Sequence, residues 1–331
     1  MVTNVLRDFI DIPQVWERID RVEERLFEVS TSDDPFLTEI AQHLLAAGGK
    51  RFRPVLSQLA AEFGPSRDDR LIEAGTAVEL IHVGSLYHDD VIDGAETRRG
   101  TVSVNTKWGN AHAILAGDFL IARASELAAI SLGLDTVRLL ARTYTELVVG
   151  QALELRLTGD LAHGPAEHYR VMGGKTASLI RTAARMGALA ADAPSRYVEA
   201  LSVATWELGM VFQITDDALD LVATDEQLGK PAGSDIHQGV YTLPVLRALE
   251  GPSGVRISAL LAGGMPFAET TVAEVIDLVQ EGGYIDEIID ECVNRLDVAS
   301  EAIASLPDID ARSVLQEMGS FLVKRVRAAS G

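Results

Sequence analysis

Apolar residues recur at intervals of three and four along most of this chain of 331 residues. That spacing matches the 3.6-residue repeat of an α-helix and predicts helices with one buried face. It is clearest in Pro13–Ser30, Ala111–Leu132, Thr136–Leu157 and Tyr284–Ser305. The alternation typical of a strand is confined to a short stretch at Gly100–Val104. The pattern therefore predicts an all-α chain of about ten to thirteen helices.

Turn-forming residues separate these helical segments. Proline and glycine interrupt helices, and an Asp or Ser beside them is a common residue at a helix start. No linker of low complexity and no internal repeat interrupts the pattern, so we predict a single domain over residues 1–331. The predicted helix boundaries lie at Asp34-Pro35, Gly64-Pro65-Ser66, Gly133-Leu134-Asp135, Gly164-Pro165, Ala193-Pro194-Ser195 and Gly251-Pro252-Ser253.

Charge and cysteine content exclude several classes of protein. Asp and Glu number 49 against 29 Lys and Arg, a net charge of −20, which argues against nucleic acid and against anionic membranes as partners. The single cysteine, Cys292, excludes an internal disulfide framework and fits a reducing, cytoplasmic setting. The longest uncharged stretch, Ile257–Ala268, is shorter than the ~20 residues that a transmembrane helix needs. We expect no transmembrane segment.

One acidic pattern of five residues occurs twice, each time after a strongly apolar helical segment. The copies are Asp89-Asp90-Val91-Ile92-Asp93 and Asp216-Asp217-Ala218-Leu219-Asp220. The first and fifth residues of each copy share one helix face. Carboxylates this close together repel one another unless cations neutralise them. The repeated pattern predicts a shared site for a hard cation such as Mg²⁺, and the alternative is a pair of solvated helix ends.

Basic residues are scarce, and they gather beside glycines. Such short basic stretches predict contacts to phosphate, and the alternative for each one is ordinary surface charge. A nucleotide-binding P-loop is excluded, because position 169, where the motif needs glycine, holds Tyr169. The basic stretches are GGKRFRP from Gly48 to Pro54, Arg98-Arg99, Lys175 and Lys230.

These motifs together resemble those of the trans-type polyprenyl diphosphate synthases. From Gly48 to about Pro244 the chain carries, in the family's order, GGKRFRP, LIHVGSLYHDDVID, RRG, GGKT, FQITDDALD and LGKPAGSDI. The resemblance implies an isoprenoid synthase-like fold, a single-domain helical bundle around a deep central cavity, in a homodimer. It also implies a 1'-4 condensation of isopentenyl diphosphate with an allylic diphosphate, assisted by Mg²⁺ with three ions in each active site.

The resemblance also assigns roles to individual residues. Asp89, Asp90, Asp93, Asp216, Asp217 and Asp220 look like the catalytic metal ligands. Lys50, Arg53, His82 and Arg99 look like the isopentenyl diphosphate site. Arg98, Lys175, Thr176, Gln213 and Lys230 look like contacts to the allylic diphosphate. One departure concerns Val240, which stands where many relatives carry a further lysine, and this puts one allylic-phosphate contact in doubt.

Two histidines precede the first acidic cluster. His82 lies seven residues, about two helical turns, before Asp89, and therefore shares its face. A binding role for His82 is our interpretation, and the alternative is a histidine satisfied in the core. His88 has no such support, and we interpret it as a packing residue or as a residue that supports the ligands from behind.

The predicted length of the product depends on three of the residues that precede Asp89 in the sequence. Ser85 lies one turn before Asp89 on nearly the same face, Gly84 is its neighbour, and Val78 is the next residue along that face. Short-chain members of the family often carry aromatic side chains at this level. The small residues predict a long-chain product, beyond geranylgeranyl. The alternatives are that Gly84 and Ser85 only allow close helix packing, and that the enzyme makes a short-chain product.

Two rival functions share parts of these motifs. A class I terpene cyclase usually pairs the first acidic motif with an Asn/Ser/Glu-type second motif and needs no isopentenyl site, so GGKRFRP speaks against it. A non-catalytic partner subunit tends to lose carboxylates or basic residues, and this chain keeps all six aspartates.

Overall fold

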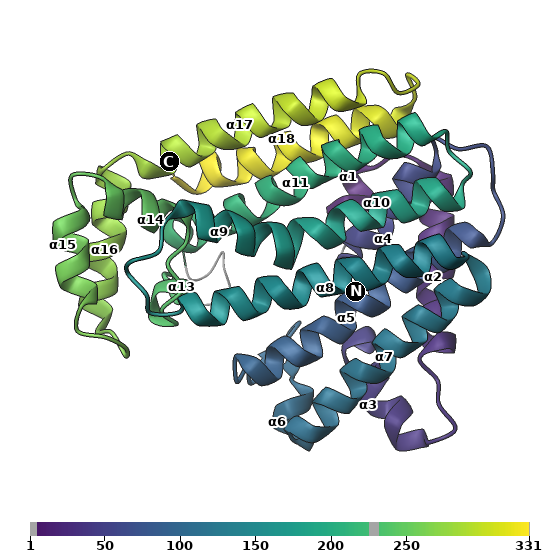
Figure 1. The fold of residues 1–331 in the computed structure, drawn as a ribbon, viewed down its shortest axis with the longest axis horizontal. Helices are drawn as coiled ribbons and strands as arrows, with labels where there is room; N and C mark the ends of the chain where they lie inside the picture. Colours follow the sequence, from purple (N-terminus) through teal and green to yellow (C-terminus); the bar gives the residue numbers. More distant parts are fainter. Residues whose placement is uncertain (1–4, 225–231, 331) are drawn as a thin grey trace. The chain divides into compact units, whose positions relative to one another are not determined.

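A computed structural model describes residues 5–224 and 232–330, and it confirms the all-α prediction (Figure 1). The first helices are α1 (Val5–Phe9), α2 (Pro13–Val29), α3 (Pro35–Ala46), α4 (Phe52–Ala61), α5 (Arg70–Ile92), α6 (Val104–Trp108), α7 (Asn110–Ser131), α8 (Leu134–Leu157) and α9 (Pro165–Met172). A π-helix, η1 (Gly173–Ala177), leads into α10 (Ser178–Ala190) and α11 (Ser195–Val222). The remaining helices are α13 (Ser234–His237), α14 (Leu243–Glu250), α15 (Gly254–Leu261), α16 (Glu269–Glu281), α17 (Tyr284–Ile303) and α18 (Asp310–Ser330).

The described residues form 17 α-helices, more than the predicted number. Part of the excess comes from α1, α6 and α13, which have five, five and four residues and are too short for a periodic pattern to reveal. Across the described ranges, no helix is both long enough and apolar enough to span a bilayer.

Several predicted boundaries are true helix starts. At α3, the Asp34 side chain accepts hydrogen bonds from the backbone N–H groups of Phe36 and Leu37, and Pro35 takes the first helical position. At α9, Pro165 again comes first, and Glu167 accepts a hydrogen bond from the Gly164 N–H. These contacts satisfy N–H groups that a helix start leaves without partners.

A two-stranded hairpin follows the first acidic cluster directly. Strands β1 (Thr97–Arg98) and β2 (Thr101–Val102) are antiparallel, and β2 lies in the stretch Gly100–Val104, where the sequence shows a short alternation. The turn between them holds Arg99 at φ 54° and Gly100 at φ 75°. A non-glycine residue in this left-handed region is uncommon, so the turn gives the Arg99 side chain a defined direction.

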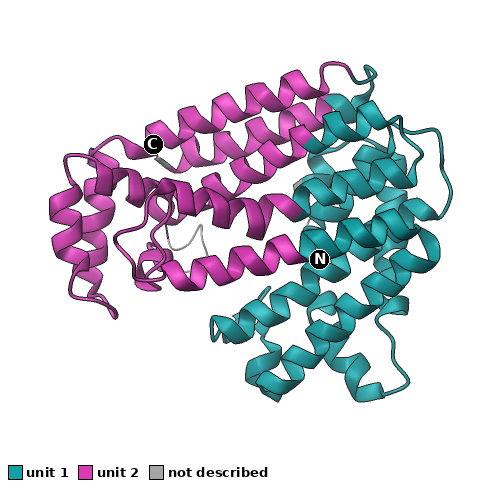
Figure 2. Cartoon of the chain, viewed as in Figure 1, with its two compact units in different colours: residues 1–144, 179–202, 306–312 teal, residues 145–178, 203–305, 313–331 magenta. Residues whose placement is uncertain are grey.

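The chain divides into two compact units, each built from separated segments (Figure 2). Unit 1 comprises residues 1–144, 179–202 and 306–312, and unit 2 comprises residues 145–178, 203–305 and 313–331. The single domain over residues 1–331 remains a prediction. The first acidic cluster lies in unit 1 and the second in unit 2.

In unit 1, α5 packs against α2, α4 and α7. It is apolar on most sides and buries residues along almost its whole length, as expected of a helix surrounded by others. The crossing with α7 is close because both helices carry glycine there. A Cβ atom at Gly84 would lie 3.0 Å from the Gly117 carbonyl oxygen, and one at Gly117 would lie 2.9 Å from the Gly84 oxygen. The two helices thereby approach closely at Gly84 and Gly117.

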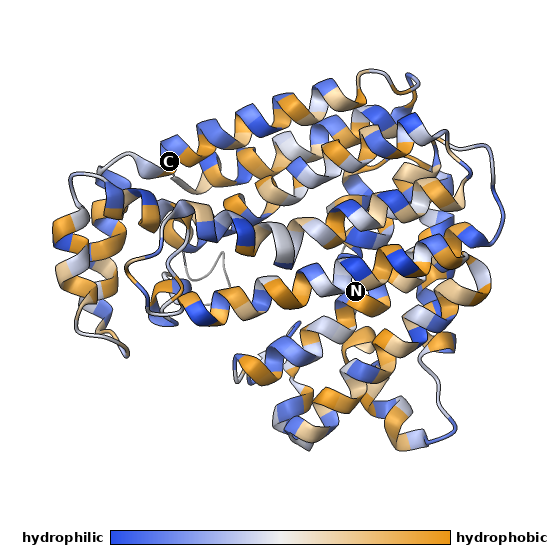
Figure 3. Cartoon of the chain, viewed as in Figure 1, coloured by the Kyte–Doolittle hydropathy of each residue, from blue (hydrophilic) through white to orange (hydrophobic). Residues whose placement is uncertain are grey.

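In unit 2, α14 packs against α9, α15, α16 and α17. Hydrophobic and hydrophilic residues are interspersed along α17, as a helix with one buried face requires (Figure 3). Its buried side includes Ile288, Cys292 and Ile303.

Candidate active site

The first acidic cluster ends α5, and its three aspartates have different environments. Asp89 is half-buried, Asp90 is 1% exposed and Asp93 is exposed. The Asp93 N–H donates to the Asp89 carbonyl at 2.8 Å, and the Asn105 amide donates to the Asp90 carbonyl at 3.1 Å. The helix end is therefore fixed by backbone contacts, which leaves the carboxylates for other partners.

Asp90 is held by the hairpin. Its Oδ1 atom accepts from Nε and Nη2 of Arg98, each at 2.6 Å, whereas no described residue donates to its buried Oδ2 atom. Burial raises the pKa of Asp90 above its ordinary value, although the charge and hydrogen bond of Arg98 lower it. A buried carboxylate oxygen without a donor suits a hard cation, so this residue fits the predicted metal. Arg98 contacts a predicted metal ligand in this structure, and its predicted contact to the allylic diphosphate remains a prediction.

An arginine cluster surrounds one buried carboxylate on α5, Glu79, which is 1% exposed. Its Oε1 atom lies 3.1 Å from Nη1 of Arg51 and 3.6 Å from Nη2 of Arg99. Sequence reasoning missed Glu79. The available signal was a glutamate within the apolar stretch of this helix, one turn before His82.

The three basic residues of the motif GGKRFRP have different environments. Arg51 is buried and donates to Glu23, Glu79 and the Leu45 carbonyl, so its charge supports the fold. The Nε atom of Arg53 is buried, and no described residue accepts a hydrogen bond from it. Burial lowers the pKa of Arg53 to about 10. It remains protonated at neutral pH and keeps a donor for an anion. Lys50 is exposed.

Arg99 joins this group from the hairpin turn. Its Nη1 atom donates to the carbonyls of Leu44 at 3.1 Å and Gly48 at 2.6 Å. A Cβ atom at Gly49 would lie 3.1 Å from Arg99 Cζ, so the glycine allows this approach. The structure thus brings the glycine loop and Arg99 together, as predicted.

His82 belongs to the same electropositive region. Burial, and then the nearby charges of Arg53, Arg99, Arg51 and Arg98, hold its pKa well below the ordinary value. The imidazole is therefore neutral at neutral pH and can donate one hydrogen bond without adding charge. The neighbouring His88 contacts Asp118 at 3.3 Å and the Ile114 carbonyl at 3.2 Å, which agrees with a packing role.

The second acidic cluster, on α11, also contains aspartates in different environments. Asp216 is exposed, whereas Asp217 and Asp220 are each 2% exposed. Gln213 donates to Asp217 Oδ1 at 2.9 Å, and its own Oε1 accepts from Thr176 Oγ1 at 2.7 Å. Thr176, Gln213 and Asp217 are therefore brought together, as their predicted shared site requires.

Asp217 has one more partner, which sequence reasoning missed. His168 on α9 is buried, and its Nε2 atom lies 2.8 Å from Asp217 Oδ2. No spacing or motif in the sequence connects these residues, so only the fold could have revealed the pair.

The other predicted residues of unit 2 lie around this group. Asp220 Oδ2 accepts from the Asp235 N–H at 3.1 Å, and the Asp220 carbonyl accepts from the Gly233 N–H at 2.8 Å. Lys175 on η1 forms an ion pair with Glu154 on α8. Lys230 lies outside the described residues.

The fit of a divalent ion rests on these carboxylates. Among the described residues, no group of three or more His, Cys, Asp or Glu side chains is arranged to hold an ion on its own. Mg²⁺ binds through one or two carboxylates together with waters and substrate phosphates, so the predicted ion does not need such a group, and its identity remains a prediction. The convergence of both acidic clusters on one cavity remains a prediction.

The residues predicted to set the product length lie inside unit 1. A Cβ atom at Gly84 would lie 2.9 Å from Cγ1 of Ile121 on α7, so Gly84 has a packing role. Ser85 is buried and donates to the His82 carbonyl at 2.8 Å, and Val78 is fully buried. Their effect on chain length remains a prediction.

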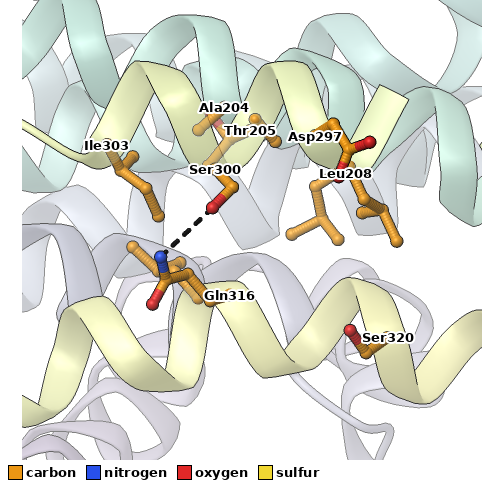
Figure 4. A pocket seen from close by; sticks show the side chains of 11 residues that line it. Ala204, Thr205, Leu208, Asp297, Ser300, Ile303, Gln316 and Ser320 are labelled. Carbon is orange, nitrogen blue, oxygen red and sulfur yellow. Dashed lines mark hydrogen bonds between the residues drawn. The ribbon is translucent and has the colours of Figure 1, made fainter. Parts of the chain in front are cut away.

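Two of the pockets of unit 2 lie apart from the predicted site residues. One, of about 220 Å³, lies between α11, α17 and α18, where Gln316 donates to Ser300 at 3.3 Å (Figure 4). The other, of about 490 Å³, is lined by residues that include Val149, Gly174 and Trp206. None of the predicted site residues is among the described residues that line either pocket.

A model of the polyprenyl synthetase family matches residues 34–279, well over half of the chain. This chain therefore belongs to the polyprenyl synthetase family and is a prenyltransferase enzyme.

Individual relatives extend over nearly the whole chain. The nonaprenyl diphosphate synthase of Mycobacterium tuberculosis is 38% identical over 323 residues, which cover 97% of this chain and 96% of that protein. Heptaprenyl diphosphate synthase component 2 of Geobacillus stearothermophilus is 41% identical over 307 residues, covering 92% and 94%. A polyprenyl synthase from Caulobacter crescentus, solved with calcium and isoprenyl diphosphate, is 34% identical with a TM-score of 0.87, covering 95% and 96%. Divalent-metal dependence follows from this family membership.

Proposed function

We propose that the protein condenses isopentenyl diphosphate with an allylic diphosphate in a 1'-4 reaction that gives a trans-polyprenyl diphosphate. One observation carries the proposal: α5 presents an electropositive region around His82 and carboxylates at Asp89 and Asp90, about two turns apart. Two diphosphates need such a pair of sites, because one can bind directly to arginines and the other through cations on the carboxylates.

We assign the carboxylates to Mg²⁺, with three ions in each active site. A divalent ion supplies the charge that neutralises the diphosphate leaving group of the allylic substrate. Asp90 Oδ2, to which no described residue donates, and the exposed Asp93 and Asp216 support this assignment. The residues that would hold the ions are Asp89, Asp90, Asp93, Asp216, Asp217 and Asp220.

The protein's own residues perform the remaining tasks. Arg53, Arg99 and Lys50 bind the diphosphate of isopentenyl diphosphate, and neutral His82 donates a further hydrogen bond. Lys175 and Thr176 bind the allylic diphosphate from η1. Ionisation of the allylic C–O bond then gives a delocalised cation, which the double bond of isopentenyl diphosphate attacks. Proton loss completes the new isoprene unit, and apolar walls exclude water during this sequence.

We propose a long-chain product. The small residues Gly84 and Ser85 one turn before Asp89 support it, as do the nonaprenyl and heptaprenyl synthases among the relatives. The alternative is a short-chain product, which the geranylgeranyl diphosphate synthase of Methanosarcina mazei, 33% identical, represents.

We also propose a homodimer located in the cytoplasm. Large apolar residues are exposed on α7 and α8, among them Leu115 at 58%, Ile130 at 78% and Val149 at 56%. Exposed apolar residues of this size favour burial against a partner. The single cysteine, Cys292, is buried and unpaired, which fits a reducing compartment.

The decisive experiment supplies purified protein with labelled isopentenyl diphosphate, several allylic primers and Mg²⁺, and then sizes the products. A polyprenyl synthase releases pyrophosphate only when both substrates are present. Release from the allylic substrate alone would identify a terpene cyclase. No release from any combination would indicate a non-catalytic partner subunit and refute the proposal.

A further inference from the structure

The pair His168–Asp217 connects two elements of unit 2 that are distant in sequence. His168 lies on α9 and Asp217 on α11, and their relative exposures are 6% and 2%. Since a carboxylate oxygen only accepts, the imidazole donates through Nε2 to Asp217 Oδ2 at 2.8 Å. A buried hydrogen bond to a charged acceptor is among the stronger interactions of a protein interior.

A second donor fixes the other oxygen of the same carboxylate. Gln213 Nε2 donates to Asp217 Oδ1 at 2.9 Å, and Gln213 Oε1 accepts from Thr176 on η1 at 2.7 Å. Asp217 is therefore held from both sides, by α9 and by its own helix, and the Gln213 side chain links it to η1. Two donors on two oxygens define the plane of the carboxylate, which one donor alone would leave free to rotate.

We propose that His168 is a positioning residue for the second acidic cluster and sets the affinity of this cluster for magnesium diphosphate. The inference rests on the proposed function, because it takes the cluster to bind the allylic diphosphate through a divalent ion. His168 itself touches neither substrate nor ion. It acts by orienting Asp217, in the way that hydrogen-bond partners behind a ligating side chain tune many metal sites.

Three substitutions separate the hydrogen bond from the space that the imidazole fills. His168→Leu removes the donor and leaves Asp217 Oδ2 buried without it. His168→Gln returns an amide nitrogen near the position of Nε2, whereas the shorter side chain of His168→Asn reaches only about as far as Nδ1. His163→Leu is the matched control, because His163 lies in the loop before α9 and bonds the Asp160 carbonyl instead.

Binding of inorganic pyrophosphate in the presence of Mg²⁺ is measured by calorimetry on the folded full-length protein, and steady-state constants are measured in parallel. His168→Leu should weaken magnesium pyrophosphate binding by about 10- to 100-fold. It should raise KM for the allylic diphosphate and leave KM for isopentenyl diphosphate unchanged. His168→Gln should recover most of the affinity, and His163→Leu should match the wild type.

Other outcomes would overturn the inference. A His168→Leu variant that binds pyrophosphate as tightly as the wild type would exclude the positioning role. Equal affinities in His168→Gln and His168→Asn would exclude it too. If His168→Leu does not fold, the comparison of the glutamine and asparagine variants decides. A lower kcat with both KM values unchanged would indicate a purely structural histidine. If the wild type forms no prenyl product but His168→Leu still weakens pyrophosphate binding, the proposed function fails and the positioning role stands.

Discussion

Asp90 Oδ1 lies 2.6 Å from both the Nε and the Nη2 atoms of Arg98 and accepts hydrogen bonds from this guanidinium. The hairpin after α5 therefore holds one carboxylate oxygen of the first acidic cluster. The other oxygen, Oδ2, is buried, and no described residue donates to it. Burial raises the pKa of Asp90, and Arg98 opposes that rise. Arg98 therefore helps to keep Asp90 ionised, which a metal ligand requires.

Replacing Arg98 by alanine should shift the acidic limb of the activity profile to higher pH. Without the guanidinium the pKa of Asp90 rises further, so a larger fraction of the carboxyl is protonated as the pH falls. The half-saturating Mg²⁺ concentration, measured from pH 6 to pH 8, should rise most steeply at the acidic end. Lys107→Ala, which removes an exposed cation after the same hairpin, is the control. A pH profile identical to that of the wild type would contradict this role.

Asp89→Ala and Asp216→Ala should each lower turnover by orders of magnitude, because the charge that stabilises the leaving group depends on these carboxylates. Asp216 is exposed and Asp89 half-buried, so both variants should remain folded. Turnover is measured as product formed at saturating Mg²⁺ and both substrates. Asp135→Ala, at an exposed aspartate at the start of α8, should retain wild-type turnover. Near-normal rates in either cluster variant would refute the assignment.

His82 makes the stability of the protein depend on pH. Burial and then four arginines hold its folded-state pKa below the ordinary value, so below about pH 6.5 the unfolded chain binds a proton that the folded chain does not. This contribution to stability is present above that pH and is lost as the pH falls, by at most about 1.4 kcal/mol per unit.

His82→Gln should therefore reduce the slope of unfolding free energy against pH between pH 6.5 and pH 5, as measured by urea denaturation. His163→Gln, at a half-buried histidine of the loop before α9, controls for the loss of a histidine as such. Equal slopes in the wild type and in His82→Gln would show that His82 is not held neutral by its surroundings.

Local features of the fold could be read from the sequence because their causes are local. The Asp34-Pro35 pair predicts a helix start, since one side chain supplies the hydrogen bonds and the next residue has a suitable φ. The grouping of Thr176, Gln213 and Asp217 followed from the family resemblance, and their hydrogen bonds agree with it.

The contacts of Glu79 and His168 could not be predicted in this way. Glu79 meets Arg51 and Arg99 through three separate segments of unit 1, and His168 meets Asp217 from a helix 49 residues away. Neither contact leaves a periodic or spaced pattern, because both depend on packing between elements. The contact of Arg98 with Asp90 could not be predicted for the same reason: the sequence neighbours of Arg98 do not indicate the direction of its side chain.

Leu115→Asp should dissociate the proposed homodimer. Leu115 is 58% exposed on α7, and a twofold interface would bury it twice. Placing two carboxylates there instead of two leucines should weaken association by about 100-fold or more. Sedimentation equilibrium measures the effect against Val255→Asp, at a valine on α15 that is 86% exposed. A monomeric wild type, or an unchanged dimer in Leu115→Asp, would contradict the proposed interface.

Ser85→Phe should shorten the prenyl product. Ser85 is buried on α5 one turn before Asp89, and its hydroxyl donates to the His82 carbonyl, so the side chain occupies little space beside the acidic cluster. A phenyl ring at this level would close a tunnel that runs along α5, and elongation should stop after fewer isoprene units. Products are sized by chromatography after incubation with labelled isopentenyl diphosphate.

Two further variants distinguish a blocked tunnel from disturbed packing. Ser85→Ala removes the hydroxyl without adding volume and should leave the product length unchanged. Gly84→Ala places a Cβ atom 2.9 Å from Ile121 Cγ1 and 3.0 Å from the Gly117 carbonyl, so it should lower the melting temperature through the α5–α7 contact. A shorter product from Ser85→Phe alone supports a tunnel at Ser85. If Ser85→Phe leaves the product length unchanged, the growing chain passes elsewhere, and the small residues serve helix packing only.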